Sequence, residues 1–163
     1  MDLDALLERF GERARARDAA GFAALFTDDG LYDDGFFGRH AGRADIAAML
    51  ERFHVGGESF CWTFSDAVLA GDLGYATYCF SYLSREPESP GRLVVFDGIA
   101  RLRLRDGLIA HYAESFDRGT AFVQLGYAPP RVSKLLDRYA RGLRDTPEAA
   151  RHLEARRARG LPT

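Results

Sequence analysis

The sequence predicts an α+β fold in which a curved antiparallel sheet wraps around N-terminal helices, with further helices at the C-terminal end. Apolar residues of the first fifty positions follow helical spacing, and the pattern then changes to alternation. Such segregated helices and strands are typical of α+β domains. The 163 residues, 47% of them hydrophobic, suffice for one sizeable core but not for two ordinary domains. We therefore expect one domain over residues 1–127 and a helical extension over 128–163.

Apolar residues at helical spacing predict three helices in the first part of the chain. The first covers about residues 2–17, with a stripe made of Leu3, Leu6, Leu7 and Phe10. Asp18 has the position of an N-cap for a second, short helix that carries Phe22, Leu25 and Phe26. The third covers about residues 43–53 and ends before two glycines; its stripe is Ile46, Met49, Leu50 and Phe53.

A turn, a short strand and a loop are expected between the second and third helices. Thr27-Asp28-Asp29-Gly30 is a strong turn signal. Residues 31–34 then form a short strand. Residues 35–42 contain three glycines and two phenylalanines and are predicted to be a loop.

From residue 60 the side chains alternate in character, which predicts strands with one buried and one exposed face. Gly71-Asp72 turns the chain between the first two strands, and Asp106-Gly107 is a strong hairpin signal between the last two. A polar, proline-broken loop separates the two hairpins. The strands are expected over about residues 60–65, 75–83, 92–105 and 108–117.

The last part of the chain predicts two helices rich in arginine. Pro129-Pro130 begins one that runs to about Gly142, and Thr146-Pro147 begins one that runs to about Arg159. Residues 131–163 carry nine basic and four acidic side chains, whereas residues 1–130 carry 13 and 20. This contrast fits a basic arm on an acidic body, and it equally fits a solvated helix face.

Composition excludes several classes of partner. The net charge of −2 does not indicate nucleic acid or a membrane surface as a partner. No leader pattern and no run of about 18 apolar residues occurs, so we expect a cytoplasmic protein. Cys61 and Cys79 are expected near Ser84 and Asp66 rather than opposite each other, so both thiols should be reduced. No residue spacing indicates a metal site, and no phosphate-binding motif indicates a cofactor.

Glu114 is the most informative residue of the chain. It shares a strand face with Tyr112 and Phe116, because side chains two positions apart point the same way. These rings indicate an apolar interior, in which a carboxylate is usually paired or has a raised pKa suited to proton transfer. The alternative is a carboxylate that points outward at the sheet edge or pairs with an arginine.

Short segments spread over residues 3–127 carry a family resemblance. They are Phe26 to Asp34, Gly42 to Ile46, Gly98 to Ile109, Tyr112 to Asp117 and Gln124 to Gly126. Together they resemble the SnoaL-like branch of the nuclear transport factor two-like superfamily. This resemblance implies a cone-shaped α+β barrel with a deep pocket, commonly a homodimer joined through its open sheet. Members include polyketide cyclases, ketosteroid isomerases and limonene-epoxide hydrolases, which implies a hydrophobic small-molecule ligand and chemistry without a cofactor.

The resemblance also implies roles for individual residues. Glu114 stands where cyclases and epoxide hydrolases of this branch place their pocket aspartate. Tyr32-Asp33-Asp34 matches the Tyr-x-Asn pair that holds water in the epoxide hydrolases, although an ionised Asp accepts hydrogen bonds and cannot donate them. Those hydrolases also need an Arg-x-Asp pair on the middle strand. Residues 75–83 contain neither Arg nor Asp, which argues against epoxide hydrolysis.

The candidate catalytic residues are Glu114, Asp34 and Tyr32. The candidate ligand-binding residues are Trp62, Tyr78, Tyr82, Tyr112, Phe116 and Asp97. Several alternatives stay open: Asp34 can be a turn residue, the aromatic residues can be core, and alternation places Asp97 on the face of Arg101. His40 and His111 are expected at the surface.

Two functions follow from these candidates. The first is cofactor-free isomerisation, cyclisation or dehydration of a polyketide-, steroid- or terpene-like molecule. Glu114 would transfer the proton, and Tyr32 and Asp34 would orient substrate or water. The second is a noncatalytic binding or interaction module of the same fold. A cavity that holds Glu114 with another polar group favours the enzyme, whereas a cavity filled by Trp62, Tyr78 and Phe80 favours the module.

Overall fold

The chain forms two compact units that divide after Gly126. The structure is a computed structural model, and it describes residues 2–163. The helices of the N-terminal unit are α1 (Leu3–Arg15), α2 (Ala19–Ala23), α3 (Gly42–Gly56) and α4 (Arg118–Gln124). Its strands are β1 (Phe26–Asp34), β2 (Gly38–Ala41), β3 (Gly57–Ala70), β4 (Leu73–Ser84), β5 (Leu93–Arg105) and β6 (Leu108–Phe116).

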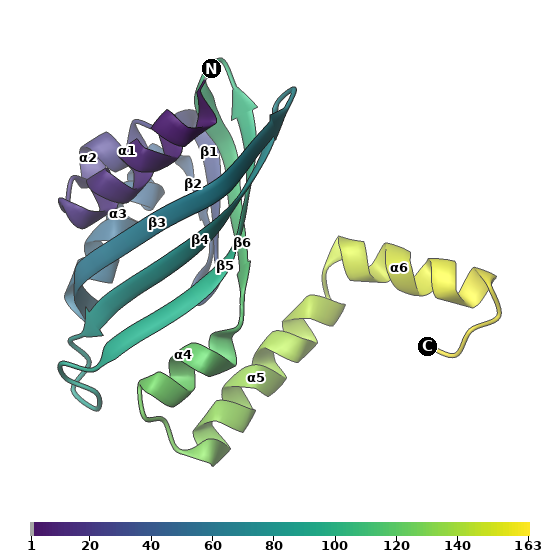
Figure 1. Cartoon of the computed structure of the whole chain (residues 1–163). Helices are drawn as coiled ribbons and strands as arrows, with labels where there is room; N and C mark the ends of the chain where they lie inside the picture. Colours follow the sequence, from purple (N-terminus) through teal and green to yellow (C-terminus); the bar gives the residue numbers. More distant parts are fainter. Residues whose placement is uncertain (1) are drawn as a thin grey trace. The chain divides into compact units, whose positions relative to one another are not determined.

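The six strands form one curved sheet in the order β2-β1-β6-β5-β4-β3 (Figure 1). Neighbouring strands are antiparallel, except that β1 runs parallel to β6. The predicted α+β class and curved sheet are therefore confirmed. The expected cone-shaped barrel is not closed in the described residues, because β2 and β3 are the free edges of an open sheet.

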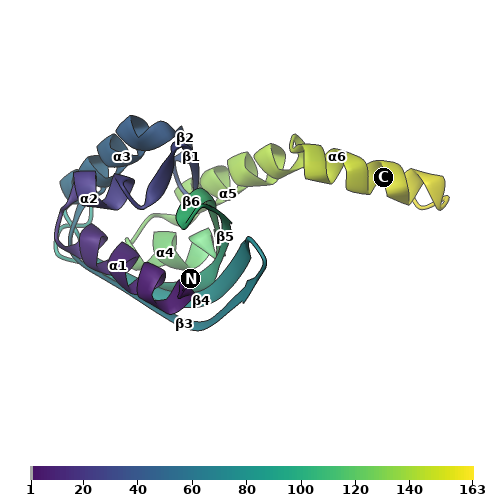
Figure 2. The same cartoon turned by 90° about the horizontal axis from the view of Figure 1, so that it is seen from above.

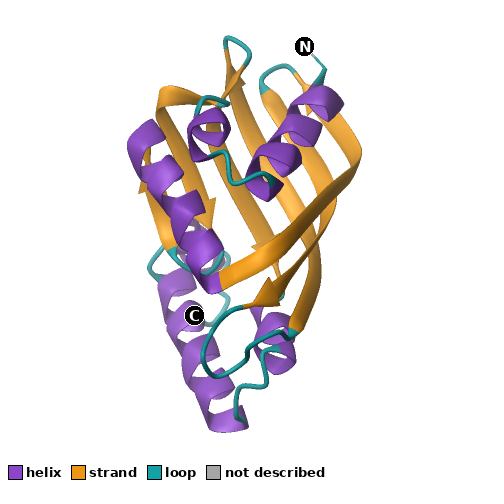
Figure 3. Cartoon of the chain, turned by 90° about the vertical axis from the view of Figure 1, so that its left-hand side faces the viewer, coloured by secondary structure: helices purple, strands orange, loops and turns teal. Residues whose placement is uncertain are grey.

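Helices α1 to α3 lie on one face of the sheet (Figure 3), and the sheet curves around this layer (Figure 2). Helix α1 packs on β3, and α3 packs on β1. The predicted stripe of α1 is buried: Leu3, Leu6, Leu7 and Phe10. The second helix begins as predicted, since the Asp18 carboxylate accepts a hydrogen bond of 2.8 Å from the Gly21 N–H.

Aromatic rings fill the space between the helices and the sheet. Phe10 is fully buried, and its ring centroid lies 4.6 Å from that of Phe22, 4.9 Å from Tyr112 and 5.0 Å from Trp62. Centroid separations of this size are typical of favourable aromatic packing. The cluster fixes the helical layer against β3 and β6, the strands that carry several candidate residues.

The predicted turn at Thr27 to Gly30 is wrong, because these residues belong to β1. The pairing of β1 with β6 shifts register between Phe26 and Leu31, so the turn-forming residues make an irregularity within the strand. Gly30 has a steric reason to be there, since a Cβ at this position would lie 2.9 Å from the Phe26 Cβ. The strand is therefore nine residues long rather than four.

Two elements were absent from the sequence-based prediction. Strand β2 lies inside the segment that was expected to be a loop, and it pairs with β1. Helix α4 follows the last strand directly. Asp117 caps it by accepting hydrogen bonds from the Gly119 N–H at 2.8 Å and from the Thr120 hydroxyl at 2.9 Å. Both elements lie next to the candidate site.

The hairpin of β3 and β4 is longer than predicted, and its register differs. Two irregularities in β3 shift the pairing, so that Cys61 lies opposite Ser81 and Cys79 lies opposite Thr63. The expected neighbours Ser84 and Asp66 were wrong for this reason. Both cysteines are free and exposed. This agrees with the prediction of reduced thiols, which was made because the two cysteines were not expected to lie opposite each other.

The C-terminal unit contains α5 (Pro129–Arg144) and α6 (Pro147–Ala158). Thr146 caps α6, because its hydroxyl accepts a hydrogen bond of 3.2 Å from the Ala149 N–H. Neither helix has a fully buried residue. Throughout residues 2–163, every helix is too short or too polar to cross a lipid bilayer.

Candidate functional site

Glu114 lies on the face of β6 that is turned toward the helices. Strand alternation puts it on the side of Tyr112, whose ring is fully buried, and not on that of exposed Ser115. On β5 the cross-strand partner of Glu114 is Ala100, which is also fully buried. The expectation that the carboxyl points inward is thus met. The side chain is half-buried, so it keeps some accessible surface within this interior layer.

Three groups donate hydrogen bonds to the Glu114 carboxyl. The Gly35 N–H lies 3.2 Å from Oε1, and the hydroxyls of Tyr78 and Tyr112 lie 3.4 Å and 3.5 Å from Oε2. These distances are longer than those of strong charge-assisted hydrogen bonds. The donors orient the carboxyl without compensating fully for a buried negative charge.

Asp34 brings a second carboxyl to Glu114. The register pairs Asp33 with Ala113, which puts Asp34 and Glu114 one step further along two adjacent strands. Asp34 is 7% exposed, and its Oδ1 accepts hydrogen bonds from the N–H groups of Phe36 (2.7 Å) and Phe37 (2.6 Å). These bonds form an Asx-type turn, so the turn alternative is observed together with proximity to Glu114.

Burial and mutual repulsion change the acidity of both carboxyls. Burial, and to a smaller extent the negative charge of Asp34, raise the pKa of Glu114 to about 8. Burial also raises the pKa of Asp34, but its two backbone hydrogen bonds and the positive charges of His40 and Arg118 act against this rise. Asp34 is therefore the carboxyl that ionises first, and Glu114 retains the proton near neutral pH.

A glycine holds Tyr78 close to Glu114. Gly98 on β5 is the cross-strand partner of Tyr78, and a Cβ there would lie 2.6 Å from the Tyr78 hydroxyl oxygen. The same Cβ would also lie 2.6 Å from the backbone oxygen of Ser115, which cannot move aside as easily as a side chain, so glycine fits this position. Tyr78 is 2% exposed, and burial raises its pKa far above the ordinary value, so the hydroxyl remains a hydrogen-bond donor.

Phenylalanine rings surround the next part of this face. The Phe116 ring stacks on Phe96 at 4.4 Å and meets Phe36 edge-on at 4.9 Å. Phe36 also lies 5.7 Å from Phe122 of α4. Rings from β5, β6, α4 and the β1–β2 turn thus give an apolar environment beside the polar groups, which suits a mostly hydrophobic ligand.

The structure does not bring every candidate to Glu114. Tyr32 is fully buried, 4.7 Å from Tyr112 between ring centroids, and its hydroxyl has no hydrogen-bond partner among residues 2–163. Trp62 reaches Tyr112 with its edge at 6.4 Å, whereas Tyr82 packs on Phe60 at 5.7 Å near the other end of β4. Asp97 is exposed on the opposite face of the sheet, so it lies apart from the other candidates.

Two charged residues near the pair were not among the candidates. Arg118, the first residue of α4, donates from Nε to the Gly35 carbonyl, and its guanidinium lies 5.5 Å from the Phe116 ring centroid. His40 was expected at the surface but is only 6% exposed. The capping pattern Asp117-x-x-Thr120 could have revealed α4 and Arg118. His40 gave no comparable signal, because a four-residue strand is too short for alternation to be recognised.

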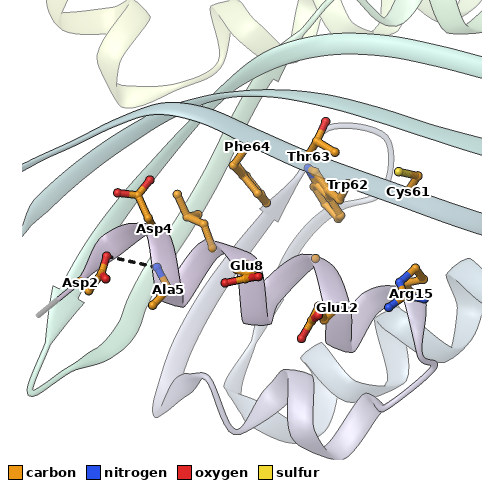
Figure 4. Close-up of a pocket in the computed structure, with 12 residues that line it drawn as sticks. Asp2, Asp4, Ala5, Glu8, Glu12, Arg15, Cys61, Trp62, Thr63 and Phe64 are labelled. Carbon is orange, nitrogen blue, oxygen red and sulfur yellow. Dashed lines mark hydrogen bonds between the residues drawn. The ribbon is translucent and has the colours of Figure 1, made fainter.

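A groove between α1 and β3 is a separate feature of the N-terminal unit (Figure 4). Its volume is about 530 Å³, and acidic side chains of α1 such as Glu8 and Glu12 line it opposite Trp62 and Phe64 of β3. Glu114 is not among its lining residues. Across residues 2–163 no three His, Cys, Asp or Glu side chains are arranged to hold a metal ion.

Sequence comparison identifies the family. The family model for the SnoaL-like domain matches residues 7–112, which is most of the N-terminal unit. The chain belongs to the SnoaL-like domain family. A comparison with curated protein sequences finds no match.

Solved structures share the fold of this SnoaL-like domain at low sequence identity. One of them is a hypothetical protein with a ketosteroid isomerase-like fold from Catenulispora acidiphila, solved in complex with trimethylamine. It is 19% identical to this chain with a TM-score of 0.69, and the match covers 76% of this chain and 93% of that chain. A putative polyketide cyclase from Xanthomonas campestris is 22% identical with a TM-score of 0.62, over 74% and 94% of the chains. An epoxide hydrolase from M. tuberculosis that resembles limonene-epoxide hydrolase is 20% identical with a TM-score of 0.62, over 75% and 87%.

Proposed function

We propose that this SnoaL-like domain binds a hydrophobic, oxygenated small molecule and catalyses cofactor-free proton transfer on it, with Glu114 as the acid–base group. The observation that carries this proposal is the placement of the Glu114 carboxyl, which accepts hydrogen bonds from the Tyr78 and Tyr112 hydroxyls and lies on the strand next to Asp34. In this position burial and the charge of Asp34 raise the pKa of Glu114 to about 8. A group with a pKa near the working pH can both give and take a proton at a useful rate. A half-buried carboxyl with a raised pKa, among polar donors and apolar rings, is a frequent feature of active sites.

The surroundings of Glu114 support particular reaction types. The Tyr78 hydroxyl remains protonated, so it can donate a hydrogen bond to a substrate oxygen as well as to Glu114. The ionised fraction of Glu114 can take the proton from a C–H next to a carbonyl, while the Tyr78 hydroxyl donates a hydrogen bond to the carbonyl oxygen on which negative charge develops. The protonated Glu114 can then return this proton to another position of the substrate. Isomerisation, aldol-type cyclisation and dehydration all pass through such an enolate-like state. We therefore favour a polyketide-, steroid- or terpene-like ketone as the ligand.

Epoxide hydrolysis is not part of the proposal. Strand β4, Leu73–Ser84, contains neither Arg nor Asp, although the fold is shared with an epoxide hydrolase. The Oδ1 atom of Asp34 also accepts hydrogen bonds from the N–H groups of Phe36 and Phe37. These bonds hold the carboxylate in one orientation, which favours a role as a fixed negative charge beside Glu114 over a role in binding an attacking water.

Proton exchange with solvent tests the proposal without knowledge of the product. Hydrophobic ketones are incubated with the protein in D2O, and deuterium incorporation next to the carbonyl is followed by mass spectrometry. We expect the natural chain to accelerate exchange for ligands that bind and Glu114→Gln to lower this rate by about 10²-fold or more. Glu51→Gln, an exposed change on α3, is the control and should leave the rate unchanged. Exchange by Glu114→Gln at the natural rate would remove Glu114 from the mechanism.

Binding without turnover is the second candidate function. Dense ring packing favours it, because Trp62 lies 4.7 Å from Phe80 and both Tyr78 and Phe80 are buried. Ligands that stabilise the protein against heat but show no Glu114-dependent exchange would support this function.

We also propose a homodimer joined through the exposed face of β4 and β5. This face carries apolar side chains that are 38–59% exposed: Tyr75, Leu93, Val95 and Ile99. Apolar side chains gathered on one face indicate an interaction surface. Light scattering should give the mass of a dimer, Ile99→Glu should give that of a monomer, and the control Val55→Glu on α3 should have no effect.

A further inference from the structure

The β1–β2 turn, residues 35–37, connects the two carboxyls of the site. Its three consecutive N–H groups are divided between them. The Gly35 N–H donates to Oε1 of Glu114 at 3.2 Å. The N–H groups of Phe36 and Phe37 donate to Oδ1 of Asp34 at 2.7 Å and 2.6 Å. Because one short turn serves both carboxyls, a displacement of the turn would change the hydrogen bonds of both at once.

Arg118 of α4 holds the other side of this turn. Its Nε donates a hydrogen bond to the Gly35 carbonyl. This carbonyl and the Phe36 N–H belong to the same peptide group, so a donor at the oxygen makes the N–H a stronger donor. The hydrogen bonds therefore form a chain that runs from the guanidinium, through one peptide group, to Oδ1 of Asp34.

Helix α4 and an aromatic ring restrain Arg118 beside this carbonyl. Gln124 ties the end of the helix to β5, since its side chain accepts from the Val95 N–H at 2.8 Å and donates to the Val95 carbonyl at 2.7 Å. The guanidinium of Arg118 lies 5.5 Å from the centroid of the Phe116 ring. A Cβ at Gly35 would collide with the same ring. Arg118 and the turn are thus packed against one side chain.

We propose that Arg118 is a positioning residue of the Glu114 site: its Nε–H holds the Gly35 carbonyl and thereby fixes the turn whose N–H groups serve the two carboxyls. This inference deepens the proposed function and rests on it. The fixed turn gives Asp34 two short hydrogen bonds and Glu114 one longer bond, so it stabilises the negative charge of Asp34 more and leaves the proton of the pair on Glu114. The charge of Arg118 acts on Asp34 in the same direction.

Other titratable groups act on the two carboxyls from the surrounding strands: Tyr32 of β1, His40 of β2, Tyr78 of β4 and Tyr112 of β6. The hydroxyls of the last two contact Oε2 of Glu114, whereas the turn contacts Oε1. The influence of the turn is therefore measurable through its own N–H groups.

Two substitutions separate the Nε–H donor of Arg118 from its charge. Arg118→Gln places an amide nitrogen at the position of Nε and carries no charge, whereas Arg118→Lys keeps the charge and places a carbon there. The readout is the pH titration of the Gly35 and Phe36 amide proton signals, followed by NMR of the full ¹⁵N-labelled chain without substrate. An amide proton bound to a carboxyl shifts when that carboxyl ionises. In the natural chain Phe36 should follow the lower midpoint of the carboxyl pair and Gly35 the upper one.

The positioning role predicts different amplitudes for the two variants. Arg118→Gln should keep the titration shifts of both amide protons, whereas Arg118→Lys should lose about half of their amplitude or more, because a hydrogen bond weakens steeply with distance and angle. The midpoints move in Arg118→Gln because its charge is lost, so the amplitude is the quantity compared. The control Arg141→Lys, an exposed change on α5, should have no effect. Natural amplitudes in Arg118→Lys, or a loss in Arg118→Gln as large as in Arg118→Lys, would overturn the proposal.

A measurement on the natural chain remains informative if these variants do not fold. The Nε–H proton of Arg118 should exchange with solvent at least about tenfold more slowly than that of exposed Arg141, because it is hydrogen-bonded. Exchange at the rate of Arg141 would contradict the role of this bond. Neither measurement uses a substrate, so failure here is distinguishable from failure of the deuterium exchange assay.

Discussion

Replacing Glu114 by Gln should stabilise the protein at alkaline pH, although it should also abolish the proposed chemistry. The folded state raises the pKa of Glu114 from 4.5 to about 8, so it binds this proton more tightly than the unfolded chain does. The free energy of unfolding therefore falls as pH rises from about 4.5 to about 8 and is constant with respect to this group outside that window. Gln resembles the protonated acid, since it keeps an acceptor for the Gly35 N–H and carries no charge.

The size of the effect follows from the shift. A difference of about 3.5 units corresponds to about 4.8 kcal/mol at 1.36 kcal/mol per unit. Glu114 is only half-buried, so solvent screening reduces this value, and we expect about 2–3 kcal/mol above pH 8. For a chain of this size, that corresponds to a rise in Tm of about 5–10 °C.

Thermal unfolding between pH 4.5 and pH 9 measures the prediction. The curves of the natural chain and Glu114→Gln should meet near pH 4.5 and separate as the pH rises, with Glu114→Gln the more stable. The exposed Glu51→Gln variant should follow the natural chain at every pH. The reasoning would be refuted if the Tm difference between Glu114→Gln and the natural chain were the same at pH 5 and pH 9. Such a result would show that Glu114 has the same pKa in the folded and unfolded states.

Two further predictions concern the groups around Glu114. Gly98→Ala should destabilise the protein by about 1–3 kcal/mol in urea unfolding, because its Cβ would lie 2.6 Å from both the Ser115 backbone oxygen and the Tyr78 hydroxyl. Gly142→Ala, with open space around it in α5, should instead stabilise the protein, and equal effects of the two changes would argue against a steric role for Gly98. Tyr78→Phe removes a hydroxyl that donates to Glu114 and lowers its pKa, so the NMR midpoint of Glu114 should rise by about 0.3–0.5 unit; a fall would contradict the hydrogen bond.

The sequence was sufficient to predict the last two strands of the sheet and to favour the inward orientation of Glu114. The strands expected over 92–105 and 108–117 correspond to β5 and β6, because alternation and the Asp106-Gly107 turn act locally and agree with each other. Glu114 followed from the same local rule. Its pKa depends on Asp34, which is 80 positions away in the chain, so only the pairing of β1 with β6 brings the two carboxyls together.

The elements that were missed depend on tertiary contacts. Thr27 to Gly30 has the composition of a turn, yet pairing along β6 and the contact of Gly30 with Phe26 make it part of a strand. Strand β2 is four residues long, and it exists because β1 pairs with it. His40 lies on that strand, so its burial was not predictable from neighbouring residues. Asp97 is the opposite case, because alternation indicated its exposed face and its selection as a ligand-binding residue went against that local rule.

The titration of the Glu114 carboxyl in the ligand-free protein tests the central claim most directly. In ¹³C NMR of the natural chain, we predict a midpoint for Glu114 near 8. Asp34→Asn should move it downward, because it removes the negative charge that disfavours ionisation of Glu114. A midpoint near 4.5 that does not respond to Asp34→Asn would contradict the account, because Glu114 would then be an ordinary solvated carboxylate without the acidity that the proposed proton transfer requires.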